Sequence, residues 1–171
     1  YLALGKAQAA LSQLDRAAQT LQQAVRLAAQ PEAERALAQV QADIARYEQA
    51  LAAASQSRAF LERMRLPDLH SLAFVIALQA QHNLALGRLD MAQHHADELI
   101  ALLRQRRHEL SLAADDPTAQ ALLSLLRGAE AADVQLAAAE YRAALAALQG
   151  QVQPNATLIK VAAYLLERVR A

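Results

Sequence analysis

Few side chains in this sequence combine the type and spacing that metal binding or acid–base chemistry requires. His82, His94 and His95 fall within one predicted helical pair, and His94 and Glu98 have the four-residue spacing of neighbours on a helix face. A metal site needs three or four ligands that converge on one point, and the sequence spacing does not show convergence. We therefore expect surface or partly packed histidines, and we predict no metal and no cofactor.

A basic cluster is formed by Arg104, Arg106, Arg107 and His108. Such a cluster could bind phosphate, but cations are also favoured near the C-terminus of a helix by the helix dipole. The chain has 17 Lys and Arg against 17 Asp and Glu, so its formal net charge is zero. We therefore expect no direct contact with nucleic acid or with a membrane.

The sequence nominates no catalytic residues. It contains no Gly-rich phosphate loop, no nucleophile elbow and no His-Glu metal-helix motif. The absence of cysteine excludes disulfides, thiol chemistry and the common structural zinc sites. We predict that the chain is not an enzyme.

The elements that would position any site are helices. The chain is 55% hydrophobic, much of this is the strong helix former Ala, and no run of alternating β-branched residues predicts a strand. An all-α fold follows, with helix starts at Pro31, Asp68, Asp116-Pro117 and Asn155 and a helix end at Gly87. Helices are predicted over about 1–11, 14–29, 31–45, 47–64, 69–86, 89–110, 117–127, 133–149 and 155–170.

The stretch 31–64 has two possible structures, because neither Gly nor Pro follows Pro31 to interrupt it. One is a single helix of that length. The other is two helices that meet at Ala45-Arg46, and we favour it because Tyr47 then takes the repeat position that Leu14 takes earlier.

A short pattern recurs along the chain. The segment from Ala10 to Ala17 contains a small residue in a turn, then a large apolar residue, an acidic residue and an Ala that begins a second helix. Similar segments start near Ile44, Ala85 and Val134. Tyr47 lies 33 residues after Leu14, and the 75 residues from Ala10 to Ala85 are close to two periods of about 34 residues with a short insertion. A period of about 34 residues is typical of helical repeat proteins.

This pattern resembles the tetratricopeptide repeat family, in which Leu4-Gly5 and Tyr1 also occupy expected positions. The resemblance covers about residues 1–149, although Trp is absent and Leu-Gly is missing from later repeats. It implies a right-handed superhelix of antiparallel helix pairs within a single domain, 1–171. The implied repeats are about 1–29, 31–64, 68–110 and 117–149, closed by a terminal helix at 155–170. Tyr1, Tyr47 and Tyr141 would lie in the core.

The resemblance also implies that ligands lie on a concave surface formed by the first helix of each pair. Carried over residue by residue, the partner-binding groove consists of Lys6, Arg35, Gln39, Asp43, Gln81 and Leu84. Neighbouring lining positions are Leu2, Ala9, Ala10, Ala42, Ala77, Ala85, Leu122, Leu126, Ala129 and Glu130. Asn is largely missing from this groove, which leaves open whether it takes a terminal carboxylate as known members do. The same polar side chains could also be solvated helix faces.

The function expected from the resemblance is protein–protein interaction, with a peptide or partner domain bound on the concave surface. One alternative is a sensory, effector-binding region of a bacterial transcription regulator or cyclic-dinucleotide signalling protein, whose DNA-binding or catalytic domain lies outside this chain. Another is a helical bundle that dimerises through the apolar face of its terminal helix, including Ile159 and Leu166. We expect a cytoplasmic monomer or homodimer excised from a longer protein, since the chain lacks a starting Met.

Overall fold

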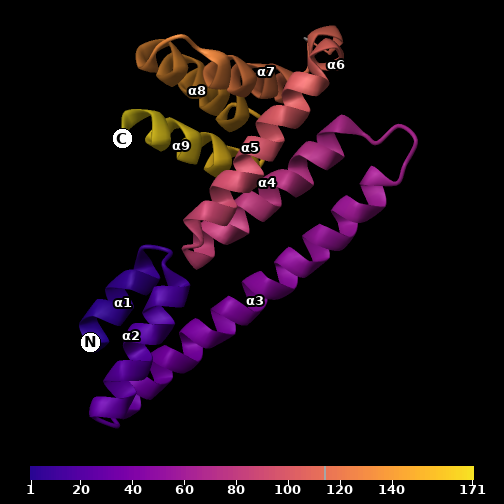
Figure 1. Cartoon of the computed structure of the whole chain (residues 1–171). Helices are drawn as coiled ribbons and strands as arrows, with labels where there is room; N and C mark the ends of the chain where they lie inside the picture. The colour runs from indigo at the N-terminus through magenta and orange to yellow at the C-terminus, as the bar shows by residue number, and fades with distance from the viewer. Residues whose placement is uncertain (114) are drawn as a thin grey trace.

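The computed structural model describes residues 1–113 and 115–171 and contains only helices within them (Figure 1). This confirms the all-α fold class. None of the described helices combines the length and the hydrophobicity that a membrane crossing requires. The helices are α1 (Leu2–Ala10), α2 (Leu14–Leu27), α3 (Pro31–Glu62), α4 (Leu69–Leu86), α5 (Leu89–Gln105), α6 (Arg107–Leu112), α7 (Pro117–Glu130), α8 (Val134–Gln149) and α9 (Ala156–Arg170).

Most helix ends lie where capping residues predict them. The Asp68 carboxylate accepts a hydrogen bond from the Ser71 backbone N–H at 2.8 Å, which satisfies a free donor at the start of α4. Asp116 and Asn155 cap α7 and α9 in the same way. Gly87 ends α4 with φ +81°, a left-handed conformation that costs a glycine little.

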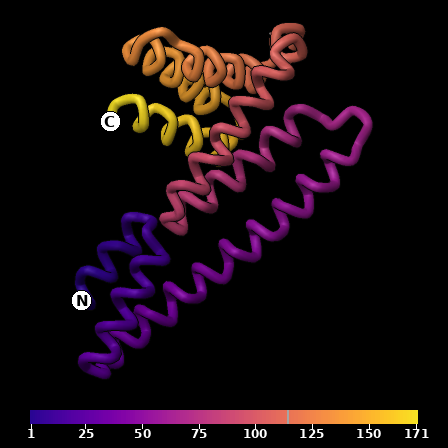
Figure 2. Tube along the Cα trace, viewed as in Figure 1, coloured from indigo at the N-terminus to yellow at the C-terminus, as the bar shows by residue number. Residues whose placement is uncertain are grey.

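The prediction of two helices over 31–45 and 47–64 is wrong. Residues Pro31–Glu62 form one continuous helix, α3, which runs as an unbroken coil along one side of the molecule (Figure 2). Ala45 and Arg46 are both good helix formers, and no residue there can cap a helix. The partly buried positions Ile44, Tyr47 and Leu51 also keep one helical phase across the expected break, so nothing forces the chain to turn.

The predicted helix over 89–110 is interrupted instead. α5 ends at Gln105 and the short α6 begins at Arg107. Between them, the Arg106 guanidinium donates two hydrogen bonds, of 3.2 and 3.1 Å, to the Pro67 carbonyl in the α3–α4 connection. The break between α5 and α6 thus coincides with hydrogen bonds that join two segments distant in sequence.

Two separate clusters of buried apolar residues hold the helices together. The N-terminal core consists of Leu14, Ala17, Leu21, Val40 and Leu86, so α2 and α3 share it with the end of α4. The C-terminal core is the set of 26 buried residues between Leu69 and Leu166 and draws on α4 to α9. α3 supplies no fully buried residue to the C-terminal core.

The terminal helix α9 packs on α8 and also folds back onto α4, which is far from it in sequence. Leu158, Val161 and Leu165 on its apolar face are at most 4% exposed. Ile159 packs against the same core, and Leu166 belongs to it. The face expected to mediate dimerisation is therefore covered within the chain itself.

The three tyrosines predicted for the core differ in their environments. Tyr141 is 4% exposed and lies in the C-terminal core, which confirms its prediction. Tyr1 is 63% exposed, so its prediction is wrong, because it is the N-cap of α1 and its side chain does not pack on the N-terminal core. Tyr47 is half-buried beside the N-terminal core.

Candidate functional site: the central cleft

Residues of the α1–α2 hairpin, of the C-terminal end of α4 and of the terminal helix α9 line an open cleft. Its volume is about 480 Å³, within the range of small-ligand and peptide side-chain pockets. We call this feature the central cleft. Its lining residues are Leu11, Ser12, Gln13, Arg16, Tyr47, Gln81, Leu84, Ala85, Gly87, Leu89, Lys160, Ala163, Tyr164 and Glu167.

Two interhelical turns form one wall of the central cleft. Ser12, in the α1–α2 turn, has φ +55°, a left-handed conformation that is uncommon outside glycine. Gly87, in the α4–α5 turn, packs against this turn, and a Cβ atom at Gly87 would lie 3.1 Å from the Gln13 Cα. The lack of a side chain at Gly87 therefore allows the two turns to approach each other closely.

An ion-pair group fixes the position of the α1–α2 hairpin relative to α4. Arg88 donates to Asp15 of α2 and to Glu48 of α3, each at 2.8 Å. These hydrogen bonds raise the pKa of Arg88 above its ordinary value, with Asp15 as the first cause. Because Arg88 immediately follows Gly87, the ion pairs hold the turn that forms the cleft wall.

Three charged side chains in the central cleft have no ion-pair partner among the described residues, namely Arg16, Lys160 and Glu167. Apolar side chains accompany them, with Leu11 70% and Leu89 60% exposed at the cleft. This combination offers contact area for an apolar group and free charges of both signs to orient it.

Two buried polar atoms of adjacent α4 residues also lack a hydrogen-bond partner among the described residues. They are the Gln81 amide oxygen and the His82 Nδ1 atom. The imidazole of His82 lies against the Tyr47 ring, with the ring centroids 5.5 Å apart. Burial, followed by the charge of Lys160, lowers the pKa of His82, because both disfavour the charged ring.

The six predicted groove residues fall into two groups. Gln81 and Leu84 line the central cleft, whereas the other four lie towards the beginning of the chain and do not line it. There Lys6 pairs with Glu32, and the Arg35 side chain donates to the Pro31 carbonyl at 3.3 Å. Gln39 donates to Asp43 at 3.1 Å.

Some neighbouring positions carried over from the family are wrong as surface positions. Ala77, Leu122 and Leu126 are at most 1% exposed, because α4 and α7 are covered by other helices on both sides. Lys160 and Tyr164 were missed, although both line the cleft. They belong to α9, and no pattern in the sequence indicated that this helix folds back towards α4.

The arginines of the basic cluster near the end of α5 all have ion-pair partners within the chain. Arg104 and Arg107 both pair with Glu130 of α7, and Arg106 pairs with Glu109. A second pocket of about 420 Å³, lined partly by Arg104 and Arg168, also has its cations paired, since Arg168 lies 3.5 Å from Asp97. Only the central cleft, of these two pockets, offers unpaired cations among the described residues.

A polar cluster joins the far half of α3 to α4 and α5. The Arg58 guanidinium donates to both oxygens of Glu98, at 2.8 and 2.9 Å, and to the Gln79 amide oxygen at 3.1 Å. The Arg58 hydrogen bond is the main cause that lowers the pKa of Glu98 to about 2, and a hydrogen bond from His95 adds to it. Ion pairing therefore complements the few apolar contacts between this half of α3 and the C-terminal core.

The geometry of the central cleft is thus the main functional indication in this chain. Comparison with models of known protein families, with curated proteins and with solved structures found no match to it.

Proposed function

We propose that this chain is a protein–protein interaction module of the tetratricopeptide-like α-solenoid class, and that it binds a peptide or a partner segment in the central cleft. The adjacent helix pairs α1–α2, α4–α5 and α7–α8 support a repeat architecture. The long α3 departs from it, because this helix occupies the place of a whole pair.

The observation that carries the proposal is the composition of the central cleft. Six helices or their turns contribute to it, and it brings the exposed Leu11 and Leu89 together with the unpaired Arg16 and Lys160. Exposed apolar side chains and unpaired cations around one concavity do not stabilise the fold. A bound segment would cover the apolar side chains and would pair with the cations.

A peptide selection tests the proposal. Short random peptides are selected for binding to the immobilised chain, and their affinities are measured by isothermal titration calorimetry. A double variant, Arg16→Glu with Lys160→Glu, should weaken the selected peptides at least about tenfold, because two positive charges at the site become negative. Circular dichroism checks that the variant stays helical.

The matched control is Arg142→Glu, which changes an exposed arginine of α8 that does not line the cleft. Peptide affinity should be unchanged in this control. A further variant, Arg35→Ala with Gln39→Ala, asks whether the binding surface extends along α3 to the first group of predicted groove residues. If the double charge reversal leaves every selected peptide bound as before, the central cleft is not the binding site.

The volume of the central cleft also supports a second candidate, a sensory region that binds a small effector for a bacterial regulator or cyclic-dinucleotide signalling protein. A cavity of about 480 Å³ can hold a small molecule. A screen of metabolites and nucleotides by thermal shift would separate the two candidates, since a ligand that binds only the folded state raises the melting temperature. A shift that Lys160→Glu abolishes would favour the effector-binding function.

A further inference from the structure

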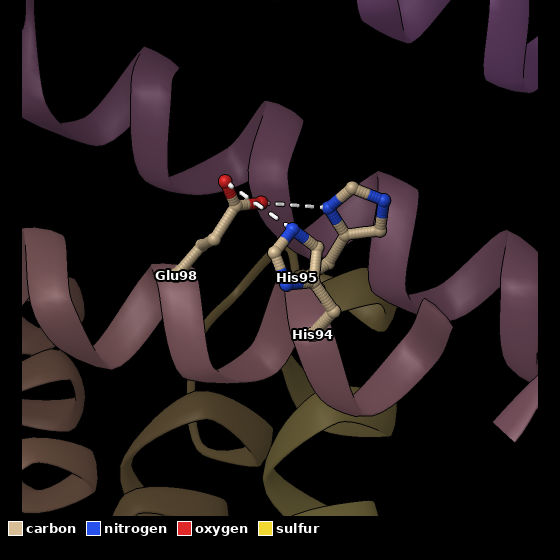
Figure 3. Close-up of side chains that lie close together, drawn as sticks. All are labelled: His94, His95 and Glu98. Atoms are coloured by element: carbon tan, nitrogen blue, oxygen red, sulfur yellow. Dashed lines mark hydrogen bonds and ion pairs between the residues drawn. The ribbon is translucent and has the colours of Figure 1, made fainter. Parts of the chain in front are cut away.

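Three potential metal ligands meet on one face of α5, away from the central cleft. His94, His95 and Glu98 each direct one donor atom to the same place, and these three atoms lie within 4.8 Å of one another (Figure 3). The His95 Nδ1 atom is 2.8 Å from one Glu98 oxygen, and the His94 Nε2 atom is 3.8 Å from the other. Helix geometry explains the meeting, because residues three and four apart share a face.

The distances suit a metal ion after small side-chain rotations. A first-row divalent ion binds nitrogen and carboxylate oxygen at about 2.0–2.2 Å. An ion between three donors whose separations do not exceed 4.8 Å can reach all of them when each side chain moves by less than about 1 Å. His94 has a side chain that is 62% exposed, so it is free to rotate and leaves an entry path from solvent.

Arg58 already holds both oxygens of Glu98, but this does not use up the carboxylate. A carboxylate offers about four lone-pair sites, and a bidentate arginine occupies two of them. The positive charge of Arg58 is also shared, since its Nε atom donates to Glu62 at 2.7 Å. Arg58, Glu62 and Glu98 together carry one negative charge, which leaves the cluster able to attract a cation.

We propose that His94, His95 and Glu98 bind one divalent transition-metal ion, with water in the remaining coordination positions. Two imidazole nitrogens and one carboxylate oxygen form a ligand set that suits Zn²⁺, Ni²⁺ or Cu²⁺, whereas Mg²⁺ and Ca²⁺ prefer oxygen ligands alone. The site differs from the central cleft in both residues and ligand class, so a test of metal binding is independent of a test of peptide binding.

Calorimetric titration of the metal-free chain with Zn²⁺ tests this site. One ion should bind per chain, and Mg²⁺ should give no comparable heat. His94→Ala and His95→Ala should each weaken Zn²⁺ at least about tenfold, because each removes one of three protein ligands. His94→Ala is the cleaner variant, since its exposed side chain contributes little to packing.

His70→Ala is the matched control, because His70 pairs with Asp116 at 2.8 Å but belongs to no group of three potential metal ligands among the described residues. It should leave the Zn²⁺ affinity unchanged. Nitrogen chemical shifts of the imidazoles, recorded with and without Zn²⁺, should change at the His94 Nε2 and His95 Nδ1 atoms. An affinity that survives the loss of both histidines, or the lack of saturable binding to the wild-type chain, would overturn the assignment.

Discussion

The two cores of this chain differ greatly in size. Among the described residues, the N-terminal core has five buried members and the C-terminal core has 26. The small core includes Leu86 at the end of α4. Arg88, in the turn that follows, forms an ion pair with Asp15 of α2. Local stability follows the amount of buried apolar contact, so the α1–α2 hairpin depends on the larger body. The central cleft lies at the boundary between these unequal parts, where a small energetic change alters the geometry most easily.

The strongest test of this difference compares matched truncations in the two cores. Both side chains are at most 1% exposed, so each truncation should lower the free energy of unfolding. The expected loss is about 3–5 kcal/mol for Leu126→Ala in the larger core and about 2–3 kcal/mol for Leu21→Ala in the smaller core. Denaturant melts give the two values. Hydrogen exchange should show that Leu126→Ala weakens protection throughout α4–α9, whereas Leu21→Ala weakens it in α1, α2 and the first half of α3. Equal loss across the chain in both variants would show that the cores form one cooperative unit.

Each core also contains one close contact between a glycine and a large side chain. A Cβ atom at Gly128 would lie 2.6 Å from the Tyr141 ring, and one at Gly5 would lie 2.6 Å from the Leu21 side chain. Gly128→Ala and Gly5→Ala should each cost about 1–3 kcal/mol through overpacking, with the larger loss at Gly128, because the tyrosine ring is rigid and belongs to the larger core of 26 buried residues. Thermal melts of the pair provide the measurement. A larger loss at Gly5 would mean that the small core is the less adaptable one.

The Arg88 ion pairs connect the two parts, and we expect a smaller effect from their removal. Arg88→Met should destabilise the hairpin by about 1 kcal/mol, since the side chains of Arg88, Asp15 and Glu48 are all at least one-third exposed and solvent screens their attraction. A double-mutant cycle with Asp15→Asn isolates one of the two pairs. A coupling energy near zero would assign the docking of the hairpin to Leu86 and the turn contact alone.

The smallest predicted effect concerns pH at the boundary. The pKa of His82 is lower in the folded chain than in the unfolded chain, because burial and Lys160 disfavour the charged ring. The unfolded state therefore binds more protons as the pH falls below about 6.5, and the folded state loses stability there. Denaturant midpoints between neutral and mildly acidic pH should fall more steeply for the wild type than for His82→Gln. If the midpoints of the wild type and of His82→Gln fall equally with pH, groups other than His82 cause the pH dependence of stability.

The sequence predicted the helices better than their arrangement. Asp68, Gly87, Asp116 and Asn155 act locally, so each marks a helix end whatever the tertiary fold. The repeat pattern, in contrast, placed a turn at Ala45-Arg46 on register alone. Register indicates which residues are alike, but a turn requires a residue that stops the helix, and none is present there.

The candidate site was predictable only in part, for a related reason. Gln81 and Leu84 were predicted from the family resemblance, and both line the central cleft from α4. Lys160 and Tyr164 depend on the return of α9 to α4, a contact between residues about 80 positions apart that no local pattern encodes. The sequence indicated only part of the His94, His95 and Glu98 cluster. The four-residue spacing places His94 beside Glu98, but only the structure shows that His95 points to the same carboxylate.

The continuity of α3 has a mechanical consequence. At 1.5 Å per residue, 32 residues span about 48 Å, so this helix is a stiff lever attached at one end by apolar packing and at the other by the Arg58–Glu98 ion pair. Tyr47, which lines the central cleft, lies near its midpoint. A tilt of a few degrees about that midpoint would therefore move the two ends of the helix by about 1–2 Å in opposite directions.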